Sequence, residues 1–291
     1  MKKTKNWLVS TIFLGPSLII YSILVIVPVL FSTYYSLTDW NGIGKQKFVG
    51  IMNFIKMFKD ADFLVSFQNS IICTVISILL QIPVGLLLAY LLYRGIKGFK
   101  IFRAIYFLPV VIAPMAIGLM FTLFLNDQTG VMNKLLGLIG LQSLQHAWLS
   151  DPKVVLYSVI APQVWQYIGL YVIIFIAAMQ TISEEILESA SIDGATNVTI
   201  FSRIVVPMIS DVIKLSVILC FTGSMKAFDL PWIMTAGGPG VKSAYLGVYM
   251  FKAAFINTKF GIGSAATIVI LVTALVFTVV FNKLTDKDVL E

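Results

Sequence analysis

The acidic residues of this chain include one close group. Residues 183–196 read SEEILESASIDGAT and lie between two long apolar stretches. The group consists of Glu184, Glu185, Glu188 and Asp193. Grouped carboxylates can bind a metal ion or act as general acid and base, but such sites usually add histidine or paired aspartates. The segment has neither, and His146 is the only histidine in the chain, so we expect neither an enzyme nor a metal site.

Two other patterns that could carry chemistry fail on spacing or context. The stretch GGPGVKS at 237–243 lacks the G-x-x-x-x-G-K-[ST] spacing of a phosphate-binding loop, which excludes nucleotide binding there. Cys73 and Cys220 both lie inside apolar stretches, where cysteine usually serves as a small packing residue. We therefore expect no cofactor in this chain.

One apolar stretch carries a polar face. Gln163, Gln166, Tyr167 and Tyr171 recur at i, i+3, i+4 and i+8, which places them on one side of a helix. Amides and aromatic rings suit sugars, whose hydroxyl groups need hydrogen-bond partners and whose C–H faces stack on rings. The same residues commonly form hydrogen bonds between membrane helices. The pattern leaves both a substrate pathway and helix packing open.

The elements that position these residues are apolar and long. Of the 291 residues, 58% are hydrophobic and 12% are charged, against about 25% charged in soluble domains. Most charge-free runs exceed the roughly 20 residues that a helix needs to cross a bilayer. We expect an all-α integral membrane protein with one transmembrane domain over residues 1–291. Its six predicted spans are 9–33, 69–93, 104–126, 155–180, 212–234 and 261–282.

Basic residues indicate the orientation of the spans. Arg94, Lys97, Lys100 and Arg103 fall within one ten-residue loop, and such clusters mark the cytoplasmic side. We therefore expect a multi-pass protein of a bacterial-type inner membrane with both termini in the cytoplasm. The acidic segment, defined here as residues 184–207, then also faces the cytoplasm.

The acidic segment has the signals of two short helices joined by a turn. Thr181 and Glu184 fit a capping box, with Ser183 as a competing N-cap. Gly194 suits a turn with positive φ, and a second helix is expected from about Asn197 to Pro207. An ordinary solvated loop remains the alternative.

At this point the sequence resembles a known family. ESASIDGATNVTIFSRIVVP, residues 188–207, is similar to the EAA motif of binding-protein-dependent ABC importer permeases. The matching positions are Glu188, Ala190, Gly194, Ile204 and Pro207, while Ser189 and Val206 depart conservatively. FDLPWIMTAGGPG at 228–240 resembles a second motif of the carbohydrate-type permeases, which include those for maltose, multiple sugars and glycerol 3-phosphate.

The resemblance implies a type I ABC importer architecture in which the acidic segment is a coupling helix for an ATPase. The implied coupling residues are Glu188, Ser189, Ala190, Asp193, Gly194, Ala195, Ile204 and Pro207. The implied partners are two ATPase subunits that bind ATP and magnesium, a second homologous permease in a heterodimer, and an extracytoplasmic sugar-binding protein. The implied cargo is a di- or oligosaccharide. A glycerol-3-phosphate permease is the alternative, and a self-sufficient secondary transporter is a more distant one.

The resemblance also extends the predicted substrate pathway to the helix before the second motif. The pathway residues are then Gln163, Gln166, Tyr167, Leu170, Tyr171, Gly223, Ser224 and Ala227. Lys226 and Asp229 stand three residues apart in the same predicted span. On one helix this spacing favours an ion pair, which we expect near the outer mouth.

Overall fold

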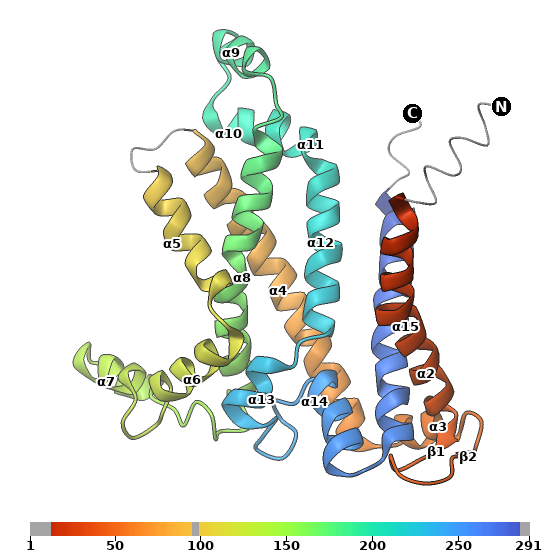
Figure 1. Ribbon diagram of the computed structural model, residues 1–291. Helices are drawn as coiled ribbons and strands as arrows, with labels where there is room; N and C mark the ends of the chain where they lie inside the picture. Colours follow the sequence, from red (N-terminus) through yellow and green to blue (C-terminus); the bar gives the residue numbers. More distant parts are fainter. Residues whose placement is uncertain (1–12, 95–98, 286–291) are drawn as a thin grey trace, which may run out of the picture. The chain divides into compact units, whose positions relative to one another are not determined.

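The computed structural model describes residues 13–94 and 99–285, and helices make up most of this part of the chain (Figure 1). A helix runs over Phe13–Ser36, and its last part is α2, Val27–Ser36. The other helices are α3 (Met52–Phe58), α4 (Ala61–Tyr93), α5 (Phe99–Val111), α6 (Pro114–Phe124), α7 (Val131–Leu138), α8 (Val155–Met179), α9 (Glu184–Ile192), α10 (Asn197–Ile200), α11 (Val206–Met208), α12 (Ser210–Met225), α13 (Asp229–Thr235), α14 (Leu246–Phe251) and α15 (Phe260–Thr285). Two short antiparallel strands, β1 (Thr38–Asp39) and β2 (Lys47–Phe48), form a hairpin.

Within the described residues, four helices are long and apolar enough to cross a membrane. They are Phe13–Ser36, Ala61–Tyr93, Val155–Met179 and Phe260–Thr285. Two bent helix pairs bring the number to six if each pair is one span, namely Ala104–Val111 with Pro114–Phe124 and Asn197–Met208 with Ser210–Thr235. The predicted helical membrane architecture is therefore confirmed in its coarse form, as a mostly helical chain with four to six candidate spans. Residues 9–12 of the first predicted span lie outside the described part.

The third predicted span, 104–126, is broken rather than straight. α5 and α6 meet at an angle of 101°. Pro114 opens α6, and Ala113 before it is extended, with ψ 133°, because the proline ring disfavours a helical conformation in the preceding residue. Proline also has no N–H, so the chain cannot continue the hydrogen-bond ladder across this point.

The fifth predicted span, 212–234, is broken as well. α12 ends at Met225 after 16 residues, about 24 Å of helix, which is short of the roughly 30 Å hydrocarbon core. Three non-helical residues, 226–228, separate it from α13. Gly247 lies against this break, and a Cβ there would come within 2.8 Å of the Ala227 carbonyl oxygen. Close backbone contact at a glycine thus supports the break.

The chain divides into two compact units. The first comprises residues up to Ala61 together with Tyr249–Leu271, and the second comprises Asp62–Val248 and the chain from Val272 onward. In the first unit, the buried Asn53 amide donates to the carbonyl oxygens of Ser36 and Thr38, at 2.9 and 2.8 Å. These bonds fix the turn between α2 and the hairpin.

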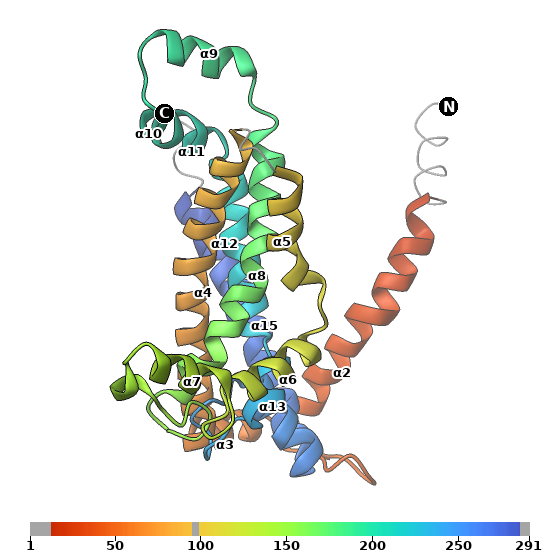
Figure 2. The same ribbon diagram turned by 90° about the vertical axis from the view of Figure 1, so that its left-hand side faces the viewer.

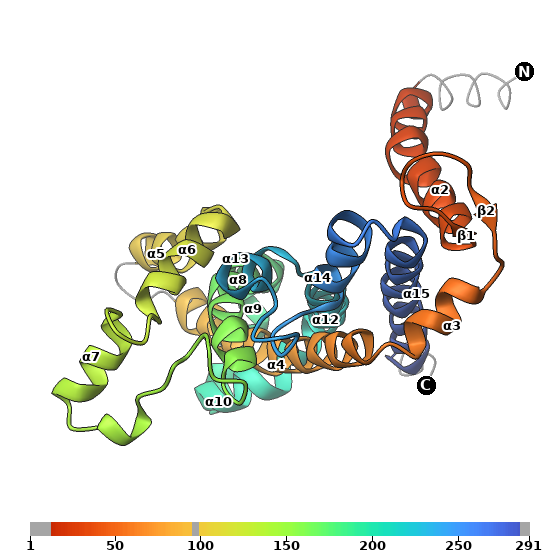
Figure 3. The same cartoon turned by 90° about the horizontal axis from the view of Figure 1, so that it is seen from below.

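The second unit is built around α4, α8 and α12, and Figure 3 shows α8 and α12 on one side of α4. Glycines allow the helices to approach closely. A Cβ on Gly85 of α4 would lie 2.9 Å from Tyr171 Cβ of α8. A Cβ on Gly169 of α8 would overlap the carbonyl oxygen of Tyr106 on α5. α8 therefore packs closely on α4 and, at backbone distance, on α5.

The two ends of this unit carry different structures. Figures 1 and 2 both show α9 beyond one end of α4, α8 and α12, and α7 and α13 near the other end. Near α13, Asn69 of α4 donates to the carbonyl oxygens of Lys242 and Ala244, each at 3.0 Å. The neighbouring Ser70 hydroxyl accepts from the Leu246 amide at 2.8 Å. The loop 236–245 is thereby held against α4.

Candidate functional site

The acidic segment forms two helical pieces joined by a turn at Gly194. Gly194 has φ +79°, which glycine adopts without steric cost. The Gly194 amide donates to the Ser191 carbonyl oxygen at 3.1 Å, and the Ala195 amide donates to the Ala190 carbonyl oxygen at 3.0 Å. These two bonds are the Schellman pattern that ends a helix. The predicted turn at 193–195 is confirmed.

The predicted capping box is wrong. Ser183 is the N-cap of α9, but its side chain makes no capping hydrogen bond. The Thr181 hydroxyl instead donates backward to the Ala178 carbonyl oxygen at 2.8 Å. Thr181 closes α8 and takes no part in starting α9. Glu184 and Glu185 still occupy the first turn of α9, where the helix dipole favours negative charge.

The second piece of the segment begins at α10 and continues through α11. The Thr196 hydroxyl accepts from the Thr199 amide and caps α10. One wide helical turn, Phe201–Val205, then connects α10 to α11, which ends at Met208. The predicted helix from about Asn197 to Pro207 is therefore present.

α10 is attached to the end of α4. The Tyr90 hydroxyl donates to the Asn197 carbonyl oxygen at 3.0 Å, and the Tyr90 ring lies 4.7 Å from the ring of Phe201. The Arg94 guanidinium donates to the Asn197 side-chain oxygen. Sequence reasoning used Arg94 only for orientation and missed this attachment, because nothing in the pattern pairs position 94 with position 197.

The eight predicted coupling residues divide by exposure. Ala190, Ala195 and Ile204 are half-buried and pack against the hydrophobic core that contains Ile200 and Val205. The exposed ones are Glu188, Ser189, Asp193, Gly194 and Pro207. An open hollow of about 650 Å³ separates α9 from the end of α4, and Glu188 and Arg94 both line it. The segment thus combines an anchored inner face with an exposed outer face.

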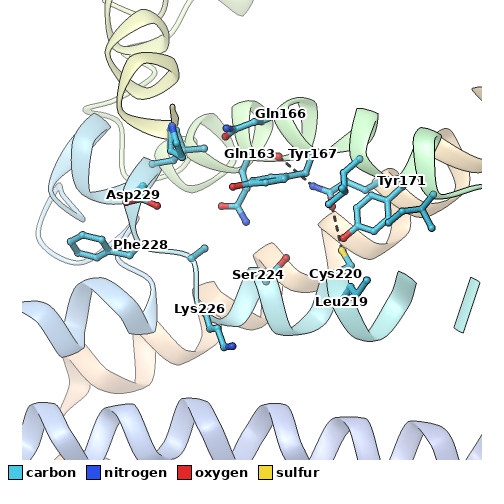
Figure 4. Close-up of a pocket in the computed structure, with 17 residues that line it drawn as sticks. Gln163, Gln166, Tyr167, Tyr171, Leu219, Cys220, Ser224, Lys226, Phe228 and Asp229 are labelled. Atoms are coloured by element: carbon cyan, nitrogen blue, oxygen red, sulfur yellow. Dashed lines mark hydrogen bonds between the residues drawn. The ribbon is translucent and has the colours of Figure 1, made fainter. Parts of the chain in front are cut away.

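A cavity of about 360 Å³ lies between α8 and α12 (Figure 4). All the predicted pathway residues line it, namely Gln163, Gln166, Tyr167, Leu170, Tyr171, Gly223, Ser224 and Ala227. In Figure 4, Gln163 and Tyr167 extend from α8 into the space that faces α12. The volume lies within the range of small-molecule sites, roughly 300–1,000 Å³. The cavity can therefore hold a small polar molecule.

The small residues of α12 serve two purposes. Ser216, Cys220 and Ser224 are buried, as expected for a helix-packing face. Gly223 is different, because a Cβ added to it would meet no atom within 4 Å. No close helix contact requires this glycine, and its missing side chain leaves room in the cavity.

The predicted ion pair between Lys226 and Asp229 is not formed in the described part of the chain. The prediction placed both on one helix, but α12 ends at Met225 and Asp229 opens α13. Both residues line the cavity. In Figure 4 the Asp229 carboxylate faces Gln163 and Tyr167, whereas the Lys226 ammonium points away from them.

Gln81 of α4 also lines the cavity, and sequence reasoning missed it. Its amide nitrogen donates to the carbonyl oxygens of Gln163 and Val164, at 3.3 and 3.5 Å. Its side-chain oxygen accepts from the Cys220 thiol, whose sulfur lies 3.3 Å away. Gln81 thereby links α4 to α8 and α12. A lone glutamine in an apolar stretch was the signal that could have identified it.

Comparisons with known proteins agree with this architecture. Residues 81–289 match the family model described as "Binding-protein-dependent transport system inner membrane component". The chain is 35% identical to the probable ABC transporter permease protein YurN of Bacillus subtilis, over 92% of this chain and 93% of that protein. It is 30% identical to the probable starch degradation products transport system permease protein AmyD of Thermoanaerobacterium thermosulfurigenes, over 99% and 97% of the two chains.

A solved structure supports the same fold. The chain resembles a chain of the bacterial alginate ABC transporter in complex with an alginate pentasaccharide-bound periplasmic protein. The TM-score is 0.83 at 23% identity, and the match covers 97% of this chain and 95% of that one. This multi-pass membrane protein belongs to the family of binding-protein-dependent transport system inner membrane components, the permease subunits of ABC transporters.

Proposed function

We propose that this chain is one transmembrane subunit of an ATP-driven importer that moves di- or oligosaccharides into the cytoplasm. The observation that carries the proposal is the cavity between α8 and α12, which is lined by amides, phenols and small residues. AmyD is named for starch degradation products and the solved transporter for alginate, so saccharide cargo is consistent with both.

The proposed topology has six spans, with each bent pair counted as one. α9 and both termini face the cytoplasm, and the loop 236–245 faces outward. The basic residues support this orientation, because Arg94 lies at the end of α4 beside the acidic segment. Lys97 is part of the same sequence cluster but lies outside the described residues. Glycosylation- or cysteine-accessibility mapping of Asp193 and Lys242 tests the orientation.

The acidic segment is proposed to dock on a cytoplasmic ATPase subunit. Ile192 and Val198 are 86% and 75% exposed, although both are apolar, so the outer face of the segment suits a protein partner. The inner face is fixed to the core through Ala190, Ala195 and Ile204. Movement of the ATPase is thereby passed to the bundle as movement of one stiff element. The chain performs no chemistry itself, and ATP and magnesium bind in the ATPase.

Transport then requires further partners. We propose that a second, homologous permease completes the pathway and that an extracytoplasmic sugar-binding protein delivers the cargo at the end that carries α7 and α13. The cavity is proposed to be the place where the sugar pauses between delivery and release. ATP-driven closure of the two ATPase subunits exposes it alternately to the two sides.

The alternatives fit the cavity less well. A glycerol-3-phosphate permease needs cations around the phosphate, and Lys226 is the only basic residue among those lining the cavity. Its ammonium group points away from the glutamines. A secondary transporter needs ion-coupling groups, and Asp229 is the only carboxylic acid in the same lining.

Reconstitution of the importer tests the proposed function. The chain is purified with its companion permease and ATPase subunits, placed in proteoliposomes with the binding protein outside, and supplied with ATP inside. We expect ATP-dependent uptake of at least one sugar from a panel of radiolabelled di- and oligosaccharides. Uphill uptake by this chain without any ATPase, or no uptake of any saccharide by an assembly that hydrolyses ATP, contradicts the proposal.

A further inference from the structure

The segment that follows α6 carries large apolar side chains that the described chain leaves uncovered. Leu138 is 82% exposed and Ile139 is 67% exposed. Val131 and Leu135 of the same helix, α7, are exposed as well. At helical spacing these four positions fall on one side, which we call the α7 face. A contiguous apolar face on a surface helix indicates a surface that meets a partner.

The opposite side of α7 is fixed to the protein. Met132 packs against a hydrophobic core of the second unit, and Leu136 is buried. The Asn133 side chain accepts from the Trp148 indole nitrogen at 2.7 Å and donates to the His146 carbonyl oxygen at 3.0 Å. α7 therefore cannot turn its apolar face inward without breaking these contacts.

The place of α7 in the second unit suits a membrane surface. Figures 1 and 2 both show α7 level with α6 along the bundle, and Figure 3 shows it at the margin, away from α12. α6 belongs to a bent pair that counts as one candidate span. Its exposed residues Met115, Leu119 and Leu123 recur at i, i+4 and i+8, so an apolar strip runs along the span towards α7.

The charge of the segment favours lipid as the partner. Residues 128–150 contain Lys134 and no acidic residue. Lys134 is exposed at the edge of the α7 face, one turn before Leu138. A helix with an apolar face and a basic edge lies in the membrane interface, with its apolar side chains at the boundary between headgroups and acyl chains. The lysine stem can lie along the apolar surface while its ammonium reaches a lipid phosphate.

We infer that α7 is an interfacial membrane anchor, which buries the α7 face among lipid acyl chains and places Lys134 beside anionic headgroups. The anchor lies at the end of the second unit that carries α13. Because Asn133 binds Trp148, which lies in the loop that leads into α8, the anchor holds this loop at the level of the membrane surface. The inference concerns lipid rather than cargo, so it holds for any transported solute.

Fluorescence quenching in nanodiscs tests the anchor. The permease–ATPase complex is placed in nanodiscs of phosphatidylcholine with about one third phosphatidylglycerol, and Leu138→Cys is labelled with a fluorophore. Cys73 and Cys220 are buried, and labelling of the parental complex gives the background. One quencher is a phosphatidylcholine with a spin label near the top of its acyl chain, and the other is iodide in solution. Parental ATP hydrolysis by the labelled complex confirms its assembly.

The matched control is Lys242→Cys, since Lys242 is exposed on the loop 236–245 at the same end. We expect the spin-labelled lipid to quench the label at Leu138→Cys at least about twofold more than the label at Lys242→Cys, and iodide to show the reverse order. The reason is that acyl chains surround the first label, whereas water surrounds the second.

Lys134 is tested in the same labelled chain. Lys134→Glu brings a carboxylate to the anionic headgroups, so quenching by the spin-labelled lipid should fall by about half or more. Lys134→Arg keeps the charge and should leave quenching unchanged. Equal quenching in the two variants overturns the contact between Lys134 and the headgroups.

Each remaining outcome overturns the anchor. Iodide quenching as strong at Leu138→Cys as at Lys242→Cys places the α7 face in water. Weak quenching by both agents places it against a companion subunit. Protection from iodide that appears only when the extracytoplasmic binding protein is added makes it a protein-docking surface. Saccharide uptake is measured separately, so the anchor and the proposed function can fail independently.

Discussion

The cavity and the acidic segment differ in how completely their polar groups are hydrogen-bonded. In the acidic segment, the turn at Gly194 satisfies its own backbone groups, and exposed side chains such as Ile192 remain for a partner. In the cavity, the side-chain oxygens of Gln163 and Gln166 are buried without partners. The turn of the acidic segment is complete in its own hydrogen bonds and leaves apolar side chains exposed. The helices around the cavity instead enclose two acceptor oxygens that no described group satisfies.

This difference shows which contacts each of the two regions depends on. The conformation of the acidic segment depends on residues that are neighbours in the sequence, from Ala190 to Thr199. The cavity depends on the distance between α8 and α12 and therefore on the packing of the whole second unit. Substitutions should therefore act in different ways. Those in the helix packing around the cavity should lower the amount of folded protein, whereas those in the acidic segment should lower transport and leave folding intact.

The largest expected effect comes from Gly169→Val. The added side chain overlaps the Tyr106 carbonyl oxygen, so α5 and α8 must separate. Overpacking at a backbone contact costs about 3 kcal/mol, a large part of the stability of most domains. We expect the amount of folded protein in the membrane, measured by immunoblotting and fluorescence-detected size-exclusion chromatography, to fall to background.

The matched control for this change is Gly223→Ala, because a Cβ at Gly223 meets nothing within 4 Å. This variant should be present at the parental level. Normal folding of Gly169→Val would refute backbone-distance packing of α5 on α8.

The next effect is Gly194→Pro in the acidic segment. Proline cannot adopt φ +79° and has no amide to donate to the Ser191 carbonyl oxygen, so the turn is lost. We expect uptake to fall to background while the protein level in the membrane stays within about twofold, because the turn is exposed. Proteoliposome uptake and immunoblotting provide the two measurements.

Gly194→Asn sharpens this experiment. Asparagine tolerates the left-handed conformation and keeps the amide donor, so at least half of the parental uptake should remain. Parental uptake by Gly194→Pro would show that the turn has no role in coupling.

A smaller effect is expected at the contact between the acidic segment and the end of α4. Asn197→Ala removes the acceptor for Arg94 but keeps the carbonyl oxygen that accepts from Tyr90. The acidic segment then stays attached to α4 by one link fewer. We expect sugar transported per ATP hydrolysed to fall about threefold, since hydrogen bonds to charged groups contribute roughly 1.5–3 kcal/mol when buried and less at the surface.

Asn197→Asp is the matched control, because it keeps an oxygen for Arg94 and adds a charge of opposite sign. Its transport per ATP should equal or exceed that of the parent. An unchanged ratio in Asn197→Ala, with uptake and ATP hydrolysis measured in the same vesicles, would show that this contact transmits nothing.

The sequence predicted local features well, but it predicted contacts between distant parts of the chain poorly, and both outcomes have physical reasons. Gly194, the second helix from Asn197 and the face formed by Gln163, Gln166 and Tyr167 all follow from backbone preferences or helical periodicity. These rules act over one or two turns of helix. The family resemblance added the α12 side of the cavity, which periodicity alone did not assign.

The misses all involve interruptions or long-range contacts. Proline in a helix can either kink it or break it, and at the break before Pro114 the Ile112 carbonyl oxygen accepts from Gln166, 54 positions later. Gln81 is satisfied by α8 and α12, and Asn197 by α4, which no local rule connects. Hydropathy likewise identified residues 212–234 as apolar, but it could not locate the break at 226–228.

The smallest expected effect tests that break directly. If Lys226 and Asp229 were helical neighbours, Lys226→Met and Asp229→Asn would be coupled in a double-mutant cycle. Because α12 ends before Lys226 and the two side chains form no ion pair, we expect the unfolding free energies to be additive within about 0.5 kcal/mol. Thermal unfolding of the purified complex without sugar measures this, since bound sugar would add its own contribution through Asp229. Coupling well above that limit would show that Lys226 and Asp229 do form an ion pair, so that the carboxylate of Asp229 is already partnered. Additivity shows that the break between α12 and α13 keeps the two side chains independent, although both line the cavity.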